Sequence, residues 1–592
     1  MVKKRSSKKK RTLFSPDEIV TKIHQAIKRD LGGSLTLSSL QEYEDAQSVK
    51  RYFADRQCTE LLKKYCAEGG VGQDALELKT FEKFLEVNEH MRAYREITLP
   101  TSNRISRHTP EDQKVLLRAR ALMGMVLSPF TMVEWAQECK HSTGSSIGVP
   151  FTDTSMERKF IYPISTTANA KPIFDVFLRL DQDLGAAVEE LNHGTVQVAQ
   201  KYDVVVGSRA TTVEKNDSIR RMIAVEPTAN MYLQQGLMNM MYRRMAKVGL
   251  DVQSLPNKHK VLALLSSLTH ENATIDWSSA SDCVSIGLLH WLLPERWWAA
   301  VDVVRCDTMT VKGQDVQLNM FSTMGNAVTF PLETLVFWTI GHAVLLSEDT
   351  TTNTLFPEWE DLGMVSVFGD DCIVPTSLAV KYMEAMSRFG FIVNNEKSFF
   401  EHEGFRESCG GDYLHGYDVR PLNIRAPVST SMSALEPWLY IMMNGFYKKY
   451  ISYFGPLTYV YDKELWRTFA QIFSDYGLQL RLVPGYYPDD SGFQMSEDIL
   501  RFTDNYQFRL AKIGRSEHGT YHFSYCSFRY HKKYRYMKHD GLRYNAWLRH
   551  PAASNNTDDW ALPKRVGGYV VAKSTSVHWT IPTKDCGGFY KP

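Results

Sequence analysis

Cysteine is scarce in this chain of 592 residues, and none of its nine cysteines forms a CxxC pair. A small, odd number of cysteines fits a reducing compartment and argues against a zinc ribbon. Long apolar runs are also missing. The longest, PLETLVFWTIGHAVLL, is interrupted by Glu333 and His342, so we expect it to be too short to span a bilayer. No apolar segment follows the basic N-terminus, so no signal peptide is predicted. These absences predict a soluble cytosolic protein.

Net charge is nearly absent as well, since 69 lysines and arginines face 67 aspartates and glutamates. The overall charge therefore gives no indication of a polyanionic partner. The first 14 residues differ, because they hold seven basic side chains and no acid. This segment is predicted to be a solvated tail or an arm that attracts RNA without sequence preference. A nuclear localisation signal is a further interpretation.

The length of the chain excludes a single core, so several subdomains are expected. Residues 15–95 are predicted to be helical, and residues 96–260 mix short strands with helices. Between 261 and 425, helices alternate with short apolar strands, which predicts an α+β fold with helices backing a sheet. In the remainder, 426–592, the stretch 529–549 interleaves basic residues with tyrosine and tryptophan. That stretch suits phosphate contacts and base stacking, and equally an amphipathic surface whose aromatic faces pack inward.

Two adjacent aspartates stand in the stretch VSVFGDDCIVP, residues 365–375. The apolar residues on both sides predict a β-hairpin with Asp370 and Asp371 at its tip. Two carboxylates about 4 Å apart repel each other by roughly 4 kcal/mol near a protein surface. A bound cation would relieve this repulsion. A surface turn in which Gly-Asp-Asp occurs by chance is the alternative.

A third acid is predicted at the end of another buried strand. In NATIDWSSASD, Asp276 follows an apolar strand, and a serine-rich turn then leads to Asp282 and a helix. If this strand neighbours the hairpin, three carboxylates converge. Such a group favours hard divalent cations, Mg²⁺ above all. Two ions about 3.5–4 Å apart can hold an in-line phosphoryl transfer.

A glycine-containing loop is predicted in MFSTMGNAVTFPLETLVF, where Ser322, Gly325 and Asn326 precede a helix. A glycine at a helix start lets the backbone approach a ligand, and serine and asparagine side chains can contact sugar hydroxyls. An ordinary capped helix is the alternative interpretation.

A basic segment occurs in TVEKNDSIRRMIAVEP, where Lys215, Arg220 and Arg221 precede an apolar run. Cations at this density can neutralise a triphosphate. A solvated charged turn is the commoner meaning of such a pattern.

Five stretches in this order resemble the motifs of a viral RNA-dependent RNA polymerase, and most specifically the replicase β subunit of the leviviruses, the single-stranded RNA bacteriophages. They are RMIAVEPTANMYLQQGL, IDWSSASD, STMGNAVTF, VFGDDCIVP and FRESCGGDY. The resemblance implies a right-hand polymerase with an antiparallel palm sheet backed by helices. It implies a basic flexible tail (1–14), an N-terminal helical region (15–95), fingers (96–260), a palm (261–425) and a thumb with the C-terminal region (426–592).

The resemblance also implies roles for the acids. Asp276, Asp370 and Asp371 resemble the ligands of two Mg²⁺ ions, for which Mn²⁺ can substitute. Asp282 and Asn326 resemble the pair that selects a ribose 2′-hydroxyl. The spacing from Asp276 to Asp282 is one residue longer than in many animal-virus polymerases, which weakens the assignment of Asp282.

Further roles follow from the same resemblance. Ser322 resembles a helper of ribose selection. Lys215 and Arg221 resemble the basic fingers residues that hold the incoming triphosphate, whereas Arg220 is not clearly part of that pattern. Lys397, in VNNEKSFF, resembles the lysine proposed to protonate the departing pyrophosphate. A surface lysine at a strand edge is the alternative for that residue.

The resemblance thus implies template-directed RNA synthesis that replicates a positive-strand phage genome in the cytoplasm of an infected bacterium. The implied partners are template and product RNA, nucleoside triphosphates, the host elongation factors Tu and Ts and a small-subunit ribosomal protein, with no membrane.

Two alternative functions fit part of this pattern. A reverse transcriptase usually has no glycine directly before its acid pair, whereas Gly369 stands there, and Asn326 favours ribonucleotides. A non-catalytic RNA-binding structural protein would leave the Gly-Asp-Asp hairpin and the order of the motifs unexplained.

Overall fold

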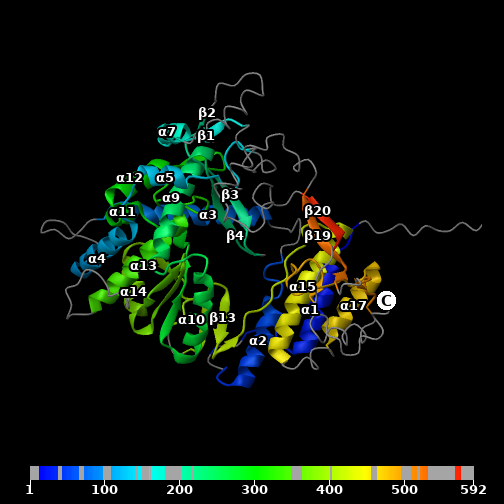
Figure 1. Ribbon diagram of the computed structural model, residues 1–592. Coiled ribbons are helices and arrows are strands. Elements are labelled where there is room, and N and C mark those ends of the chain that lie inside the picture. Colours follow the sequence, from blue (N-terminus) through cyan, green and yellow to red (C-terminus); the bar gives the residue numbers. More distant parts are fainter. Residues whose placement is uncertain are drawn as a thin grey trace, which may run out of the picture. The chain divides into compact units, whose positions relative to one another are not determined.

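A computed structural model gives the fold of the chain (Figure 1). The residues that it describes are 13–37, 40, 43–65, 73–97, 108–141, 144–149, 159, 162–180, 202–216, 218–348, 363–400, 403–454, 463–494, 508–515, 520–530 and 567–574. The chain forms two compact units. The first unit is made of residues 1–71, 421–536 and 565–592, and the second is made of residues 72–420 and 537–564. The predicted fingers and palm ranges therefore lie mostly in the second unit, together with residues 72–95.

The second unit packs its helices around one large apolar core that includes the fully buried Trp297 and Trp338. Its helices are α3 (Gln73–Met91), α4 (Pro110–Leu127), α5 (Met132–Glu138), α7 (Lys171–Leu180), α9 (Thr228–Ala246), α10 (Leu255–Thr269), α11 (Ile286–Leu292), α12 (Glu295–Val304), α13 (Thr329–Glu348) and α14 (Thr376–Arg388). Several begin at a side-chain cap. Thr109 caps α4 and Ser285 caps α11, which satisfies backbone N–H groups that have no partner within the helix.

The strands of the second unit are short and form several small sheets. They are the pair β1 (Ile164–Thr166) and β2 (Tyr202–Val204), the four-stranded sheet β4 (Arg220–Val225), β3 (Ser208–Glu214), β7 (Thr308–Val311) and β8 (Gln314–Gln317), the three-stranded sheet β5 (Asn272–Ile275), β10 (Asp371–Pro375) and β9 (Ser366–Phe368), the pair β6 (Trp277–Ser278) and β11 (Ile392–Val393), and the three-stranded sheet β12 (Phe405–Ser408), β13 (Gly411–Leu414) and β14 (Tyr417–Asp418). The predicted mixture of helices and strands is confirmed, although β1 pairs with β2, and β3 with β7, in parallel.

The sheet β5–β10–β9 is antiparallel throughout, and it carries the predicted hairpin. Its central strand is apolar and buried, with Cys372, Ile373 and Val374 each less than 3% exposed. Helices α10, α13 and α14 all contact this sheet. A strand buried on both faces needs such cover, and its apolar run follows from that burial.

The apolar run that was expected to be too short for a bilayer forms the 20-residue helix α13. That expectation was wrong about length, because the segment Thr329–Ser347 is long and apolar enough to cross a membrane. However, 89% of the segment is buried inside the protein, as in the core helix of a soluble domain. The helix is apolar on all sides because α4, α14 and the hairpin surround it.

The first unit is assembled from both ends of the chain. It contains α1 (Pro16–Leu31), α2 (Ala46–Glu60), α15 (Met432–Phe454), α17 (Glu464–Tyr476), the hairpin β19 (Ser524–Tyr530) and β20 (Gly567–Lys573), and the strand pairs β15 (Leu482–Val483) with β16 (Phe493–Gln494) and β17 (Gly514–Arg515) with β18 (Tyr521–His522). Figure 1 shows α1, α2, α15 and α17 side by side. They share an apolar core.

The predicted basic tail lies outside the described residues except for its last two positions, and so does nearly all of the stretch 529–549. Both predictions therefore stay open. Seven of the nine cysteines are described, and all seven are free thiols.

Candidate active site

The two aspartates of the hairpin stand where strand β9 turns into strand β10. Phe368 pairs with Asp371, so Gly369 and Asp370 form a two-residue turn. Gly369 has a φ of +62°, and its N–H donates to Thr334 Oγ1 at 3.0 Å. A Cβ atom at this position would lie 2.7 Å from Phe330 Cε2. Glycine is therefore required for both conformation and space, and it leaves Asp370 exposed at the tip.

Asp276 is the residue that directly follows β5, as predicted. Ile275 pairs with Cys372, so the next step of this antiparallel register sets Asp276 opposite Asp371. Opposite residues project to the same face of a sheet, which brings the two side chains together. Burial first, and then the charge of Asp370, raise the pKa of Asp371 to about 7. Burial likewise raises the pKa of Asp276.

The segment after β11 holds Asp276 in place. Asn394 Nδ2 donates to Asp276 Oδ2 at 2.6 Å, and the backbone N–H of Asn394 donates to the Asp276 carbonyl at 3.0 Å. Ser398 Oγ accepts from the backbone N–H of Asp276 at 3.2 Å. Lys397 lies in this segment, is exposed, and its charge opposes the rise in the pKa of Asp276. The structure thus brings Lys397 to the acids, whereas the sequence did not single out Asn394.

The predicted fingers cations reach the same cluster. Desolvation and the neighbouring charges of Arg221 and Lys397 lower the pKa of Lys215, while Asp276 and Asp370 oppose that shift. Lys215 and Arg221 are both exposed. Three basic side chains and two carboxylates are therefore electrostatic neighbours, although they come from segments far apart in the sequence.

Arg220 is placed differently from Arg221. Its Nε donates to Thr212 Oγ1 at 2.8 Å, and its Nη1 lies 3.7 Å from Glu214 Oε1, both on β3. Consecutive strand residues project to opposite faces, so Arg220 and Arg221 point away from each other. These contacts support the sheet β4–β3.

Asp282 is nearly buried next to the predicted glycine-containing loop. It accepts a short hydrogen bond from Thr323 Oγ1. Burial raises its pKa to about 6, and the charge of Lys83 opposes the rise. Ser322 Oγ contacts Thr329 Oγ1 at 2.6 Å, so this serine lies inside the loop.

Asn326 begins the turn that leads into α13. Its Oδ1 accepts from the Val328 N–H at 3.0 Å, as a helix cap does. Its Nδ2 is buried with no hydrogen-bond partner among the described residues. Gly325, with a φ of +114°, lies against β4, because the Ala224 N–H donates to the Met324 carbonyl at 2.7 Å. The loop is thus attached to the strand that carries Arg221.

Two buried residues near the acids were missed by the sequence reasoning. Glu333 on α13 is 5% exposed, and burial together with the charges of Asp370 and Asp282 raises its pKa. The signal was available, since Glu333 interrupts an otherwise apolar run. His259 on α10 contacts Ser408 Oγ at 2.9 Å and Ser366 Oγ at 3.0 Å, and burial lowers its pKa to about 4.

The acids do not form a ready-made metal centre. In the part of the chain that the structure describes, no three His, Cys, Asp or Glu side chains are grouped so as to hold an ion. Their chemistry nevertheless suits a hard cation, because they offer carboxylate oxygens. Burial raises the pKa values of Asp276 and Asp371, so their charged forms are unfavourable in the protein alone. A bound cation would compensate that negative charge.

Comparison with known proteins identifies the class of enzyme. The chain is 30% identical to an RNA-directed RNA polymerase beta chain of Enterobacteria phage fr over 435 residues, which are 72% of this chain and 73% of the relative. The corresponding protein of Escherichia phage MS2 is also 30% identical, over 72% of this chain and 73% of its own. The RNA-directed RNA polymerase subunit beta of Escherichia virus Qbeta is 32% identical over 42% of this chain and 39% of its own.

The family is shown by a second comparison. Residues 17–577 match the family model described as RNA replicase, beta-chain. The chain belongs to this family of RNA-directed RNA polymerases, as its motifs predicted. A solved structure titled "RdRp complex" is 9% identical, with a TM-score of 0.39 over 74% of this chain and 39% of that one, a likeness too slight to support an argument.

Proposed function

We propose that this protein synthesises RNA on an RNA template by a two-metal-ion mechanism, with a right-hand arrangement of fingers, palm and thumb. The observation that carries the proposal is the group of charges in which Asp276 and Asp370 act on Lys215, together with Arg221 and Lys397, while Asp371 stands beside the two acids. Acids alone would suit a structural cation site. Acids beside several cations suit a phosphoryl transfer that begins and ends with highly charged phosphates.

Mg²⁺ ions would be held by Asp276, Asp370 and Asp371, with Mn²⁺ as a substitute. When bound, they would supply positive charge for the attacking hydroxyl and for the phosphate oxygens. Asn394 would hold the Asp276 carboxylate in position by a hydrogen bond from a neutral amide, which leaves its charge available to the ions. Asp371 gains a similar neutral support from Ser408 Oγ at 3.4 Å.

The basic side chains would bind and orient the nucleotide. Lys215 and Arg221 would neutralise the triphosphate while the 3′-hydroxyl of the growing strand loses its proton to solvent and its oxygen attacks the α-phosphate. The bond from the α-phosphorus to the bridging oxygen then breaks, and pyrophosphate leaves. Lys397 would donate a proton to that leaving group. Asp282 and Asn326, with Ser322 and Gly325 shaping the loop, would contact the ribose.

Family resemblance extends the proposal to its setting. The enzyme would act in the cytoplasm of an infected bacterium and replicate a phage genome. It would work together with the host elongation factors Tu and Ts and with a small-subunit ribosomal protein. The described cysteines are free thiols, which is compatible with such a compartment.

The test is incorporation of labelled nucleotides on an RNA template with Mg²⁺, with and without an extract of the host. We expect Asp370→Asn to lower the rate roughly 100- to 1,000-fold or more, since it removes charge that acts on the reacting phosphates. Asp307→Asn is the matched control, because this exposed aspartate precedes β7 outside the cluster. Equal rates for wild type and Asp370→Asn, with the control also active, would refute the proposed centre.

A further inference from the structure

A buried polar cluster contacts the glycine-containing loop at Ala327. It consists of Gln234 on α9, Glu226 just after β4, and Cys306 just after α12, which are 0%, 2% and 3% exposed. Gln234 Nε2 donates to Glu226 Oε2 at 2.9 Å, and Cys306 Sγ donates to the same oxygen at 3.3 Å. None of these residues is used by the proposed chemistry. Fully buried polar groups are costly unless they are paired, so the cluster requires an explanation.

The orientation of the Gln234 amide is fixed by its partners. Besides Glu226, its Nε2 donates to the carbonyl of Val304, the last residue of α12, at 2.9 Å. A backbone carbonyl can only accept, so the NH₂ group must face Val304. The Oε1 atom consequently faces the loop, where it accepts from the Ala327 N–H at 3.3 Å. Ala327 directly follows Asn326.

One side chain therefore joins three segments. It contacts Glu226, which directly follows β4, the strand that carries Arg221. It also contacts the C-terminus of α12 and the loop that presents Asn326. The loop has a second attachment to β4 through the Ala224 N–H and the Met324 carbonyl, at 2.7 Å. The two attachments lie on either side of Asn326 in the sequence. Together they restrain the backbone from which the unpartnered, buried Nδ2 of Asn326 projects.

We infer that Gln234 is a positioning residue for ribose recognition, which holds the Asn326 loop against the strand of the triphosphate-binding arginine. This inference rests on the proposed role of Asn326. A preorganised loop would keep the Asn326 amide ready for the 2′-hydroxyl. If the loop were released from Gln234, the nucleotide would have to order it on binding. That cost would weaken the binding of ribonucleotides, whose 2′-hydroxyl contacts the Asn326 amide.

The inference predicts a specific loss of sugar discrimination. In the full-length chain with its host factors, Gln234→Met should raise KM for ribonucleotides about tenfold, the equivalent of one well-placed hydrogen bond. The kcat for ribonucleotides and the KM for 2′-deoxynucleotides should change little, because neither depends on the 2′-hydroxyl contact. Methionine is close to glutamine in shape, so the volume of the core is retained. The measurement is single-nucleotide incorporation with matched ribo- and deoxyribonucleoside triphosphates.

Four further variants make the test decisive. Gln235→Met is the control, since Gln235 is the next residue of α9 and makes none of the contacts described above. It should leave the discrimination unchanged. Gln234→Asn serves if Gln234→Met does not fold, because it keeps the amide but withdraws it from Ala327. Asn326→Ala should lower the discrimination itself, and Gln234→Met added to Asn326→Ala should lower it no further.

The outcomes distinguish a failure of the inferred role of Gln234 from a failure of the proposed role of Asn326. If Asn326→Ala lowers discrimination and Gln234→Met lowers the use of both sugars equally, Gln234 has only a structural role and the inference is overturned. If Asn326→Ala leaves discrimination unchanged, the proposed role of Asn326 fails, and the inference fails with it. A loss confined to ribonucleotides in Gln234→Met, absent from Gln235→Met, supports both.

Discussion

Asp282 shows at the scale of one residue how a proposed functional group opposes folding. The side chain is 8% exposed, and its neighbour Thr323 supplies one hydrogen bond. Burial nevertheless raises its pKa to about 6 from the ordinary value of 3.8. A carboxylate held in this position is thus less stable than the same group in the unfolded chain, which is typical of groups retained for chemistry.

This raised pKa predicts a gain in stability for Asp282→Asn at neutral pH. The folded state holds the proton of Asp282 more tightly than the unfolded state does. The stabilisation from that proton is complete below pH 3.8 and is lost as the pH rises through about 6. At pH 8 the variant should therefore unfold with a free energy up to about 3 kcal/mol larger than that of the wild type.

Urea unfolding of Asp282→Asn and the wild type at pH 8 and pH 4.5 measures this effect. The advantage of the variant should shrink at the lower pH, because most of the wild-type Asp282 is then protonated. The variant should also discriminate less between ribose and deoxyribose. An advantage of equal size at both pH values would show that Asp282 does not titrate as its burial indicates.

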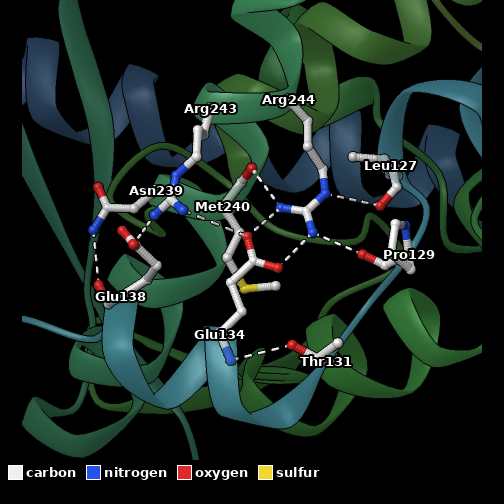
Figure 2. Close-up of polar contacts among 9 residues, drawn as sticks. All are labelled: Leu127, Pro129, Thr131, Glu134, Glu138, Asn239, Met240, Arg243 and Arg244. Carbon is white, nitrogen blue, oxygen red and sulfur yellow. Dashed lines mark hydrogen bonds and ion pairs between the residues drawn. The ribbon is translucent and has the colours of Figure 1, made fainter.

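At the scale of elements, Arg244 joins α9 to α5 and to the turn between α4 and α5 (Figure 2). Its guanidinium contacts both oxygens of Glu134, at 2.8 and 2.6 Å. It also donates to the carbonyls of Leu127 and Pro129, at 3.0 and 2.7 Å. A planar group with five donors can satisfy all these acceptors at once, which lysine cannot do.

Arg244→Met is expected to lower the free energy of unfolding by about 3 kcal/mol, because it removes both close hydrogen bonds to Glu134 and the donor to the Pro129 carbonyl. Arg243→Met is the matched control. Arg243 is 53% exposed and pairs with Glu138, so its loss should cost less than about 1 kcal/mol. Urea unfolding of both variants tests the difference. Equal costs would mean that the buried network contributes no more than the surface pair.

The loop of Gly325 offers a second test among the elements. A Cβ atom at this position would lie 2.0 Å from the Ala224 carbonyl oxygen, so Gly325→Ala must push the loop away from β4. We expect nucleotide incorporation to fall at least tenfold, since the displacement moves Asn326 away from Arg221. The assay is ribonucleotide incorporation, with unfolding measured in parallel.

Gly313→Ala separates this clash from backbone strain. Gly313 also has a positive φ, +83°, in the turn between β7 and β8, but a Cβ atom there meets nothing within 4 Å. Its substitution should cost about 1–2 kcal/mol of stability without loss of activity. If both variants retain activity, the close contact of the loop with β4 is not required for catalysis.

At the scale of the whole molecule, the first unit depends on segments from both ends of the chain. Asp30, at the end of α1, accepts from the backbone N–H groups of Glu464 and Leu465 at the start of α17, at 2.7 and 2.9 Å. The side chain of Gln57 exchanges two hydrogen bonds with the backbone of Leu422, at 2.9 and 2.8 Å. The N-terminal helices are therefore part of the core of this unit.

Deletion of residues 1–71 should expose the apolar faces of α15 and α17 and make the remaining chain aggregate. Each large aliphatic side chain that loses its burial costs about 1.5–3 kcal/mol, and Ile19, Ile23 and Ile27 of α1 are all buried. Co-expression of residues 1–71 as a separate chain should restore solubility, because the contacts are non-covalent. Deletion of residues 1–12 is the control, since the described contacts begin at Leu13. A soluble, cooperatively folding chain without residues 1–71 would contradict this view.

The sequence by itself determined the chemistry that is local. Asp370 and Asp371 are adjacent in the chain, Gly369 must precede them in a two-residue turn, and Asp276 ends an apolar strand, so the hairpin and its acids could be predicted. The polymerase motifs were recognisable for the same reason, because each lies within a few residues of one element. The mixed helix and strand composition followed from the periodicity of apolar residues.

Only the tertiary structure decided which distant groups meet. The register between β5 and β10 sets Asp276 opposite Asp371, and packing brings Asn394 and Lys397 to the same point. In the sequence, Gln234 looks like an ordinary helix residue. Only the structure shows that its side chain contacts α12, the end of β4 and the loop of Asn326. The pairing of the N-terminal helices with α15 and α17 was equally hidden. Such contacts depend on the complementary burial of many side chains at once, which no short stretch of sequence specifies.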